Sequence, residues 1–289
     1  MASVKELRQR IRSVGSIKQI TRAMEMVATT KLRRFQDRAL ASRPYAMEIA
    51  GLIGRLAGML SGELAGRPLF QEGGGTRSLV VLVSSDRGLC GAYNSNLCRV
   101  LEAWRGERSK DELDFFVWGR KGYQYLTKRG YTVSRYLSEP SLEKMDYRGA
   151  AIAARMIVQE FLKGGHEGVW LAATRFESMV KYLPGVARFL PIASGDLTGE
   201  TVAPADVILE PDAVTIFDLL VPRYLETRVF NSLLEALTSE YASRRVAMKN
   251  ATDAAADMQK ALRGVYNRKR QENITKELLD IVGGAEALR

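Results

Sequence analysis

The feature that most constrains this chain is a heptad pattern near its carboxyl terminus. From Leu237 to Val265 the seam positions alternate in steps of four and three residues, and Arg244 is the only charged residue among them. They are Leu237, Tyr241, Arg244, Met248, Ala251, Ala255, Met258, Leu262 and Val265. This spacing is typical of a coiled coil. A helix from about 211 to 282, with Pro222 near its start, would be roughly 100 Å long, far longer than a globular domain needs.

The amino terminus carries a second apolar stripe at helical spacing. Ser3 and Glu6 are predicted to form a capping box, and no proline precedes Pro44, where the helix should kink or stop. Gly15 would weaken the helix by about 1 kcal/mol relative to alanine. The stripe consists of Leu7, Ile11, Val14, Ile17, Ile20, Met24 and Val27. Because each helix alone would expose its stripe, we expect residues 3–56 and 211–283 to pair as an antiparallel coiled coil.

Between the two ends the pattern changes to alternating strands and helices. After a glycine-rich linker, β-branched and aromatic runs predict strands separated by helical stretches. The strands are expected at 78–85, 113–119, 131–137, 168–176 and 186–192, and the helices at 95–105, 120–130 and 150–162. This alternation favours a partly parallel sheet covered by helices. The predicted fold class is therefore α/β, with a Rossmann-like α/β domain inserted between the two long antiparallel helices.

The predicted organisation has five parts, which follow from these changes of pattern. Two coiled-coil helices form the ends, and a linker and a return loop connect them to the α/β domain. The parts are an N-terminal coiled-coil helix (1–58), a linker (59–77), the α/β domain (78–193), a return loop (194–210) and a C-terminal coiled-coil helix (211–289).

Positive charge is concentrated in the two ends of the chain. Of the net charge of +10, residues 1–43 contribute +8 and residues 240–270 contribute +5, so the remainder is acidic. The ends should therefore share an acidic partner, which could be nucleic acid, an anionic membrane surface or an acidic protein face. No apolar run is long enough to cross a membrane, and the amino terminus lacks the apolar region of a secretory signal. We expect the chain to remain in the compartment where it is made.

Residues that could support catalysis or metal binding are few. Cys90 and Cys98 lack metal-site spacing, and the only histidine, His166, is expected in a surface turn. The glycine loop at 84–94 matches neither dinucleotide-binding nor P-loop spacing, so we interpret it as a tight strand-to-helix turn with Cys90 as a buried small side chain. The positions of the carboxylates in the sequence do not indicate that Asp86 and Glu177, or any other two, lie together as a catalytic pair. Catalysis by this chain alone is not expected, and a nucleotide-binding enzyme and a nucleic-acid-binding coiled coil remain the alternatives.

Three long segments carry a resemblance to a known family. SVGSIKQITRAMEMVATTKLRR (13–34), SSDRGLCGAYNSNL (84–97) and the carboxyl-terminal motifs SEYASRRVAMKNATDAA and YNRKRQENITKELLDIVGGAEAL (239–288) closely resemble the gamma subunit of F-type ATP synthases. The motifs occur in the family's order and frame the same architecture. Photosynthetic members carry an inserted pair of redox-active cysteines, which has no counterpart here, so thiol regulation is expected to be absent.

The resemblance implies a mechanical function rather than a catalytic one. Gamma is the central shaft that couples ion flow through the ring of c subunits to ATP synthesis or hydrolysis in a ring of alpha and beta subunits. Expected partners are the alpha, beta and epsilon subunits and the c-ring, with neither nucleic acid bound nor the chain inserted into the membrane. ATP, ADP and Mg²⁺ would bind to alpha and beta, so no cofactor is expected on this chain. The implied location is the cytoplasmic face of the bacterial plasma membrane, as a peripheral protein.

The resemblance also implicates particular side chains in contacts with beta. Residues matching Arg244, Gln271 and Thr275 are implicated in hydrogen bonds to a loop of beta, and Arg268 lies on the same helical stripe as the last two. A guanidinium at the seam position of Arg244 would need a compensating partner or an exit to the surface. Met24 lies in the family's AMEMVA motif and could either pack in the seam or contact beta. A basic face could be ordinary solvated surface or contact an acidic ring; it comprises Arg22, Lys31, Arg33 and Arg34.

Overall fold

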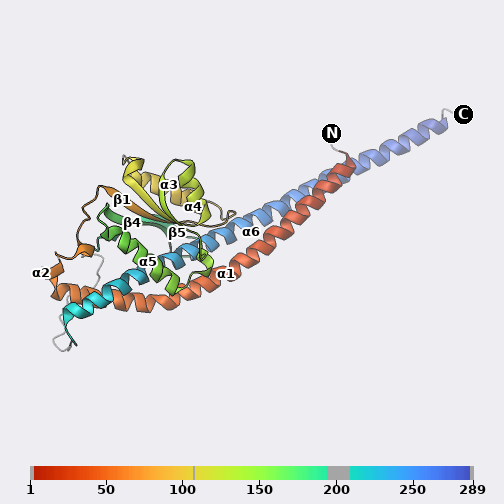
Figure 1. Cartoon of the computed structure of the whole chain (residues 1–289). Helices are drawn as coiled ribbons and strands as arrows, with labels where there is room; N and C mark the ends of the chain where they lie inside the picture. Colours follow the sequence, from red (N-terminus) through yellow and green to blue (C-terminus); the bar gives the residue numbers. More distant parts are fainter. Residues whose placement is uncertain (1–2, 65, 107, 194–208, 287–289) are drawn as a thin grey trace. The chain divides into compact units, whose positions relative to one another are not determined.

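The computed structural model describes residues 3–64, 66–106, 108–193 and 209–286 and contains two very long helices (Figure 1). Helix α1 spans Val4–Met59 and helix α6 spans Ala213–Glu286. The predicted capping box is present, since the Ser3 amide donates to Glu6 Oε2 at 3.0 Å and the Glu6 amide donates to Ser3 Oγ at 3.2 Å. The predicted return loop lies outside the described residues except for its last two positions.

Helix α1 does not stop at Pro44, in contrast to one of the two predicted outcomes. The proline lies inside the helix, which continues for fifteen more residues to Met59. Proline removes one backbone hydrogen bond, but the segment that follows buries Ile49, Ile53 and Leu56 almost completely. Burial of these side chains offsets the lost bond, so the helix persists.

The chain divides into two compact units, and this division cuts through both long helices. The first unit consists of Met1–Thr29 and Arg244–Arg289, and the second unit is Thr30–Ser243. The predicted boundaries instead separated whole helices from the α/β domain. In the second unit, α6 is buried on nearly all sides between Tyr224 and Ser243, so this part of the helix belongs to a globular core rather than to a free coiled coil.

The second unit contains a five-stranded sheet, as the alternating pattern predicted. Its strands are β1 (Arg77–Val83), β2 (Leu113–Trp118), β3 (Thr132–Leu137), β4 (His166–Phe176) and β5 (Tyr182–Leu190). They lie in the order β3-β2-β1-β4-β5, with β1 to β4 mutually parallel and β5 antiparallel to β4.

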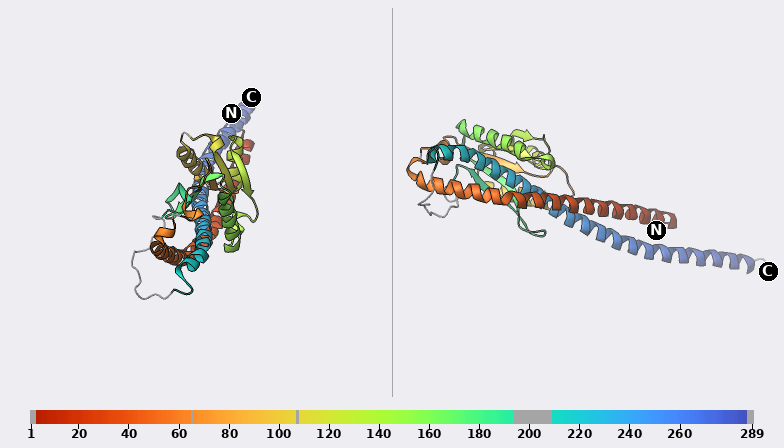
Figure 2. Two further views of the ribbon diagram at one scale, coloured as in Figure 1. Left: turned by 60° about the vertical axis from the view of Figure 1, so that its left-hand side comes forward. Right: turned by 90° about the horizontal axis from the view of Figure 1, so that it is seen from below.

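Three helices and several short ones accompany the sheet (Figure 2). They are α3 (Tyr93–Arg105), α4 (Arg120–Lys128) and α5 (Tyr147–Leu162), with α2 (Ser61–Leu64) and the 3₁₀ turns η1 (Pro68–Phe70), η2 (Lys110–Glu112) and η3 (Leu142–Lys144). A core of fully buried side chains joins β1 and β2 to α3 and α4 and includes Val80, Leu97, Leu101, Phe115 and Leu126. The partly parallel α/β fold is thereby confirmed.

His166 was predicted in a surface turn, and this prediction was wrong. It begins β4, is 6% exposed, and its Nε2 lies 3.1 Å from Oδ2 of the buried Asp114. Asp114 also pairs with Arg77 at 2.6 Å. The strand begins two residues earlier than the pattern indicated, and the glycine-rich linker covers it: the Gly73 amide donates to the carbonyl oxygen of Glu167 at 2.9 Å.

Candidate partner-binding faces of the long helices

In the first unit, α1 and α6 run antiparallel, as predicted. Arg8 Nη2 donates to the Tyr266 hydroxyl at 2.9 Å, and further along the pair the hydroxyl oxygens of Thr21 and Thr252 lie 2.8 Å apart. The residue numbers rise on one helix as they fall on the other. Two independent contacts therefore establish the direction of pairing.

The residues that occupy the seam differ from the predicted stripe. On each helix one set of buried and half-buried positions keeps a heptad spacing. On α1 they include Leu7, Ile11, Val14, Lys18, Thr21 and Ala28, and on α6 they include Met248, Thr252, Ala255, Gln259, Leu262 and Tyr266. The predicted stripe on α1 instead had two consecutive three-residue spacings, from Val14 to Ile17 and from Ile17 to Ile20. These spacings move the stripe around the helix and away from a seam with a 3.5-residue repeat.

Several predicted seam residues therefore lie on the surface. Ile17, Ile20 and Val27 of α1 are 52%, 59% and 56% exposed. Met258 and Val265 of α6 are also more than half exposed. The prediction that these five side chains pack in the seam was wrong, and they leave apolar surface along the sides of the helix pair.

Polar and small residues occupy the middle of the actual seam. A Cβ atom at Gly15 would come within 2.9 Å of the Gln259 side-chain nitrogen, so this glycine leaves room for Gln259 rather than simply weakening α1. Further along α1 from Gly15, past Lys18, the hydroxyl groups of Thr21 and Thr252 meet across the seam. Polar seam residues specify the register of a coiled coil at some expense in stability. The pair is therefore defined in register but buries little apolar surface of its own.

Beyond the start of α1, helix α6 continues alone (Figure 1, Figure 2). From 270 to 282 every residue of α6 is exposed. The exposed side chains include large apolar ones: Ile274, Leu278, Leu279, Ile281 and Val282. A helix end of this composition is costly in water unless another protein covers it.

The predicted contact residues fall into two groups. Arg268, Gln271 and Thr275 are exposed near the end of α6 and share one face by their spacing. Arg244 is 7% exposed and lies 27 residues before Gln271, about 40 Å along a helix. The structure therefore does not bring Arg244 together with the other three, and a partner would meet them at separate levels.

The basic face is also divided. Arg22, Arg33 and Arg34 are exposed, and Met24 is half-buried beside the seam. Lys31 differs because its amine lies 2.5 Å from Oε2 of Glu143, which follows β3 in the chain. Sequence reasoning missed Glu143, since nothing local marks a carboxylate that pairs with a residue 112 positions away.

The glycine loop after β1 is occupied by contacts to α6. The Tyr93 hydroxyl donates to the carbonyl oxygen of Ala236 at 3.2 Å, and the Ser243 hydroxyl donates to that of Cys90 at 2.6 Å. Within the loop, the Asn94 side-chain oxygen accepts from the amide of Ser85. Cys90 is 2% exposed, which agrees with its interpretation as a buried small side chain. The loop thus anchors α6 rather than forming an open cradle for phosphate.

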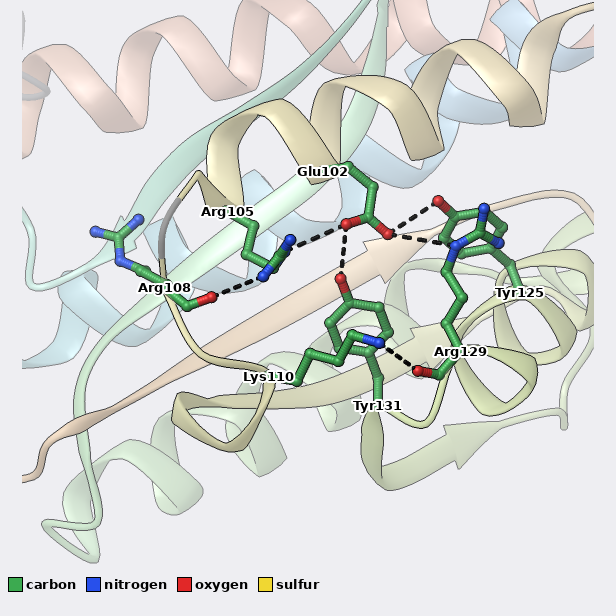
Figure 3. A network of polar contacts seen from close by, with 7 residues as sticks. All are labelled: Glu102, Arg105, Arg108, Lys110, Tyr125, Arg129 and Tyr131. Atoms are coloured by element: carbon green, nitrogen blue, oxygen red, sulfur yellow. Dashed lines mark hydrogen bonds and ion pairs between the residues drawn. The ribbon is translucent and has the colours of Figure 1, made fainter.

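Another polar network fastens α3 to α4 (Figure 3). The Glu102 carboxylate accepts from Tyr131 at 2.7 Å, Tyr125 at 3.0 Å and Arg105 at 3.3 Å. Burial opposes its ionisation, but these hydrogen bonds lower the pKa of Glu102 below its usual value. Nearby, burial raises the pKa of the Cys98 thiol to about 11. Glu102 therefore acts as an ionised structural hub.

Asp86 and Glu177 have separate partners. Asp86 Oδ1 accepts from the amide of Arg120, and Glu177 pairs with Arg175 and Lys181. Among the described residues, no group of three or more histidine, cysteine, aspartate or glutamate side chains is arranged to hold a metal ion. No helix within the described ranges is both long and apolar enough to span a membrane.

The chain matches one protein family over almost its whole length. The family is described as ATP synthase, and the match covers residues 3–288. The ATP synthase gamma chain of Geotalea uraniireducens is 36% identical over 291 residues, covering 100% of both chains. That of Mycolicibacterium gilvum is 41% identical over 308 residues, covering 99% of this chain and 98% of the relative.

Solved structures support the same assignment. A chain in a Euglena gracilis mitochondrial ATP synthase assembly of OSCP, F1 and c-ring superimposes with a TM-score of 0.70 at 20% identity, covering 99% of this chain and 94% of that one, which shows the shared fold. A chain from the central stalk and c-ring of the Tetrahymena thermophila enzyme gives a TM-score of 0.59 at 25% identity, with 80% and 99% coverage. The protein therefore belongs to the ATP synthase gamma-chain family and is the central rotor shaft of an F-type ATP synthase.

Proposed function

We propose that this chain is a non-catalytic shaft whose first unit stands inside a ring of alpha and beta subunits. Its second unit would rest on the c-ring beside epsilon, at the cytoplasmic face of a bacterial plasma membrane. The observation that carries the proposal is the end of α6, where large apolar side chains from Ile274 to Val282 are exposed. An enclosing ring of subunits would cover them, which a two-helix pair cannot do for itself.

The charges and polar groups on the two long helices support the same arrangement. Arg22 of the first unit, and Arg33 and Arg34 at the start of the second, are exposed cations that suit an acidic lining. Arg268, Gln271 and Thr275 present one polar face, so they could hydrogen-bond a loop of beta together, while Arg244 and Met24 would act at lower levels of the shaft. Because the exposed side chains differ around the helix pair, each catalytic site would meet a different surface at each angle. Rotation would then shift the conformational equilibrium of each site in turn.

The nucleotides and Mg²⁺ would bind to the alpha and beta subunits and not to this chain. The glycine loop after β1 supports this proposal because its polar groups already bond to α6 and to one another. A phosphate cradle needs backbone amides directed at an open space. Catalysis would therefore belong to the assembled complex.

Co-purification tests the shaft proposal directly. We expect a tagged chain, isolated from native membranes, to carry alpha, beta and epsilon subunits and the c-ring. A complex without alpha and beta subunits would overturn the proposal. Equilibrium dialysis of the isolated chain with ATP should reveal no tight site, and stoichiometric micromolar binding would contradict the absence of a nucleotide site.

A further inference from the structure

We propose that Lys31, Glu143 and Tyr241 form a joint that fastens the α/β part of the chain to both long helices. In this role the three side chains position the shaft so that ATP turnover stays coupled to ion movement. The inference builds on the rotor function and concerns residues within the second unit. None of the three is placed in contact with nucleotide or with another subunit.

The joint connects three separate segments of the chain. Lys31 belongs to α1, Glu143 to η3 between β3 and α5, and Tyr241 to α6. The Lys31 amine lies 2.5 Å from Glu143 Oε2 and 3.2 Å from the Tyr241 hydroxyl oxygen. The Tyr241 hydroxyl donates to the other carboxylate oxygen, Oε1. Each of the three groups therefore contacts both of the others.

The surroundings make these contacts stronger than those of an ordinary surface pair. Phe35 stacks on the Tyr241 ring with centroids 5.5 Å apart, and both side chains are almost completely buried. The Lys31 amine also lies 5.4 Å from the centre of that ring. Lys31 and Glu143 each retain 34% side-chain exposure, so solvent screens the pair only in part. Partial desolvation and a shared charged hydrogen bond both strengthen such a contact.

The connection that carries Glu143 binds both helices at further points. Arg38 of α1 donates to the carbonyl oxygen of Met145 at 3.0 Å. The Tyr147 hydroxyl donates to Glu226 of α6 at 3.3 Å, and Glu226 is 2% exposed. Residues 142–147 thus form a strap that is fixed to α1 and to α6, with Glu143 as the residue that touches both helices at once.

The position of the joint along the chain explains its functional role. Lys31 and Tyr241 lie at the two ends of the second unit, immediately before both helices continue into the first. Torque that passes between the sheet and the parts of α1 and α6 in the first unit would be transmitted through the segment of both helices that contains Lys31 and Tyr241. If the strap detached, the helices could turn relative to the α/β part, and rotation would be partly lost.

The same geometry gives Lys31 an internal function in place of a contact with an acidic ring. If Lys31 acted on another subunit, neutralising Glu143 would leave its function intact. If it acts through the joint, neutralising either partner must have the same effect. The two interpretations therefore differ in their prediction for Glu143.

The test uses the complete ATP synthase in inverted membrane vesicles, with Lys31→Met, Glu143→Gln and the exchange Lys31→Glu with Glu143→Lys. We expect each single variant to lower ATP-driven uptake of the coupling ion, H⁺ or Na⁺, per ATP hydrolysed by about threefold, while hydrolysis itself changes by less than about twofold. The exchange should recover most of the coupling. Lys144→Met, an exposed neighbour of Glu143, is the matched control and should behave as wild type.

Hydrogen exchange of the amides at 142–147, measured on the full chain in the complex, reports the joint itself. Loss of one charged hydrogen bond should raise their exchange about tenfold in both single variants. If Glu143→Gln fails to fold, Tyr241→Phe keeps the stacked ring, removes only the hydroxyl, and should shift coupling and exchange in the same direction. Normal coupling in Glu143→Gln or Tyr241→Phe, with Lys31→Met alone impaired, would overturn the proposal. Failure of the rotor function itself would instead show as absent wild-type coupling.

Discussion

Replacing Gly73 with alanine should destabilise the second unit, whereas the same change at the adjacent Gly74 should not. A Cβ atom at Gly73 would lie 1.9 Å from the carbonyl oxygen of His166 and 3.1 Å from the Phe161 ring. The first obstacle is backbone, so the linker itself has to move. At Gly74 no atom lies within 4 Å of the added carbon. Sequence alone cannot distinguish the two residues, because both belong to one run of three glycines.

The magnitude follows from what the linker loses when it moves. Overpacking at a site that cannot relax costs about 1 to 3 kcal/mol. Displacement also breaks the 2.9 Å hydrogen bond from the Gly73 amide to Glu167, which contributes about 1 kcal/mol. We therefore expect Gly73→Ala to lower the free energy of unfolding by about 3 kcal/mol. Gly74→Ala should leave it unchanged or raise it by about 0.5 kcal/mol, because alanine restricts the unfolded chain.

Urea unfolding of the full chain, followed by the fluorescence of Trp118 and the other tryptophans, measures both variants under the same conditions. Trp118 lies in β2 and is 1% exposed, so it reports on the sheet. Equal midpoints for the two variants would refute the reasoning, because the close approach to His166 would then have no energetic consequence. A crystal structure of Gly73→Ala with an unmoved linker would do the same.

Four further predictions concern the helices and the buried groups. Gln271→Leu should leave subunit assembly normal but reduce ATP turnover, and unchanged rates of both hydrolysis and synthesis would remove Gln271 from the mechanism. Thr252→Val should cost about 1 kcal/mol of helix pairing, measured by thermal unfolding, because it removes the hydroxyl contact with Thr21, whereas Ser239→Ala would not affect that contact. Cys98, with its pKa raised to about 11 by burial, should resist alkylation at pH 8 in the folded chain; rapid labelling with unchanged circular dichroism would contradict its burial. For Glu143, burial opposes ionisation, but the hydrogen bonds from Lys31 and Tyr241 lower its pKa overall. The ionised carboxylate therefore stabilises the fold above the usual carboxyl pKa range, and this stabilisation is lost as the pH falls through the lowered pKa. Glu143→Gln should flatten the acid side of a plot of unfolding free energy against pH.

Much of the architecture could be predicted from local patterns. A heptad repeat near the carboxyl terminus, an apolar helical stripe at the amino terminus and alternating strands and helices between them are short-range signals. Every strand of the sheet was expected within four residues of its observed bounds. The pairing of the ends was expected because each helix carries an apolar stripe, although five residues of the predicted stripes remain exposed. The long motifs at 13–34 and 239–288 also carried the family resemblance, which the comparisons confirmed.

What the sequence could not determine is which side chains meet. The apolar residues Ile17 and Ile20 looked like seam positions, but a 3.5-residue repeat places Lys18 and Thr21 there instead, because two supercoiled helices keep one seam while an apolar stripe can drift around it. His166 became a buried partner of Asp114 only because the linker folds over the start of β4. The hydrogen bonds between α1 and α6, such as Arg8 with Tyr266, join residues far apart in the chain, so no local pattern predicts them.

Thus the sequence by itself determined the helices, the α/β order of the domain and the family, all of which depend on neighbouring residues. Tertiary structure decided the register of the seam, the burial of Arg244 and the exposed end of α6. It also decided that Lys31 meets Glu143, since a contact across 112 residues depends on how the connection after β3 folds against α1 and α6. Local preference determines the period of an element, whereas packing against distant segments determines which of its faces is buried.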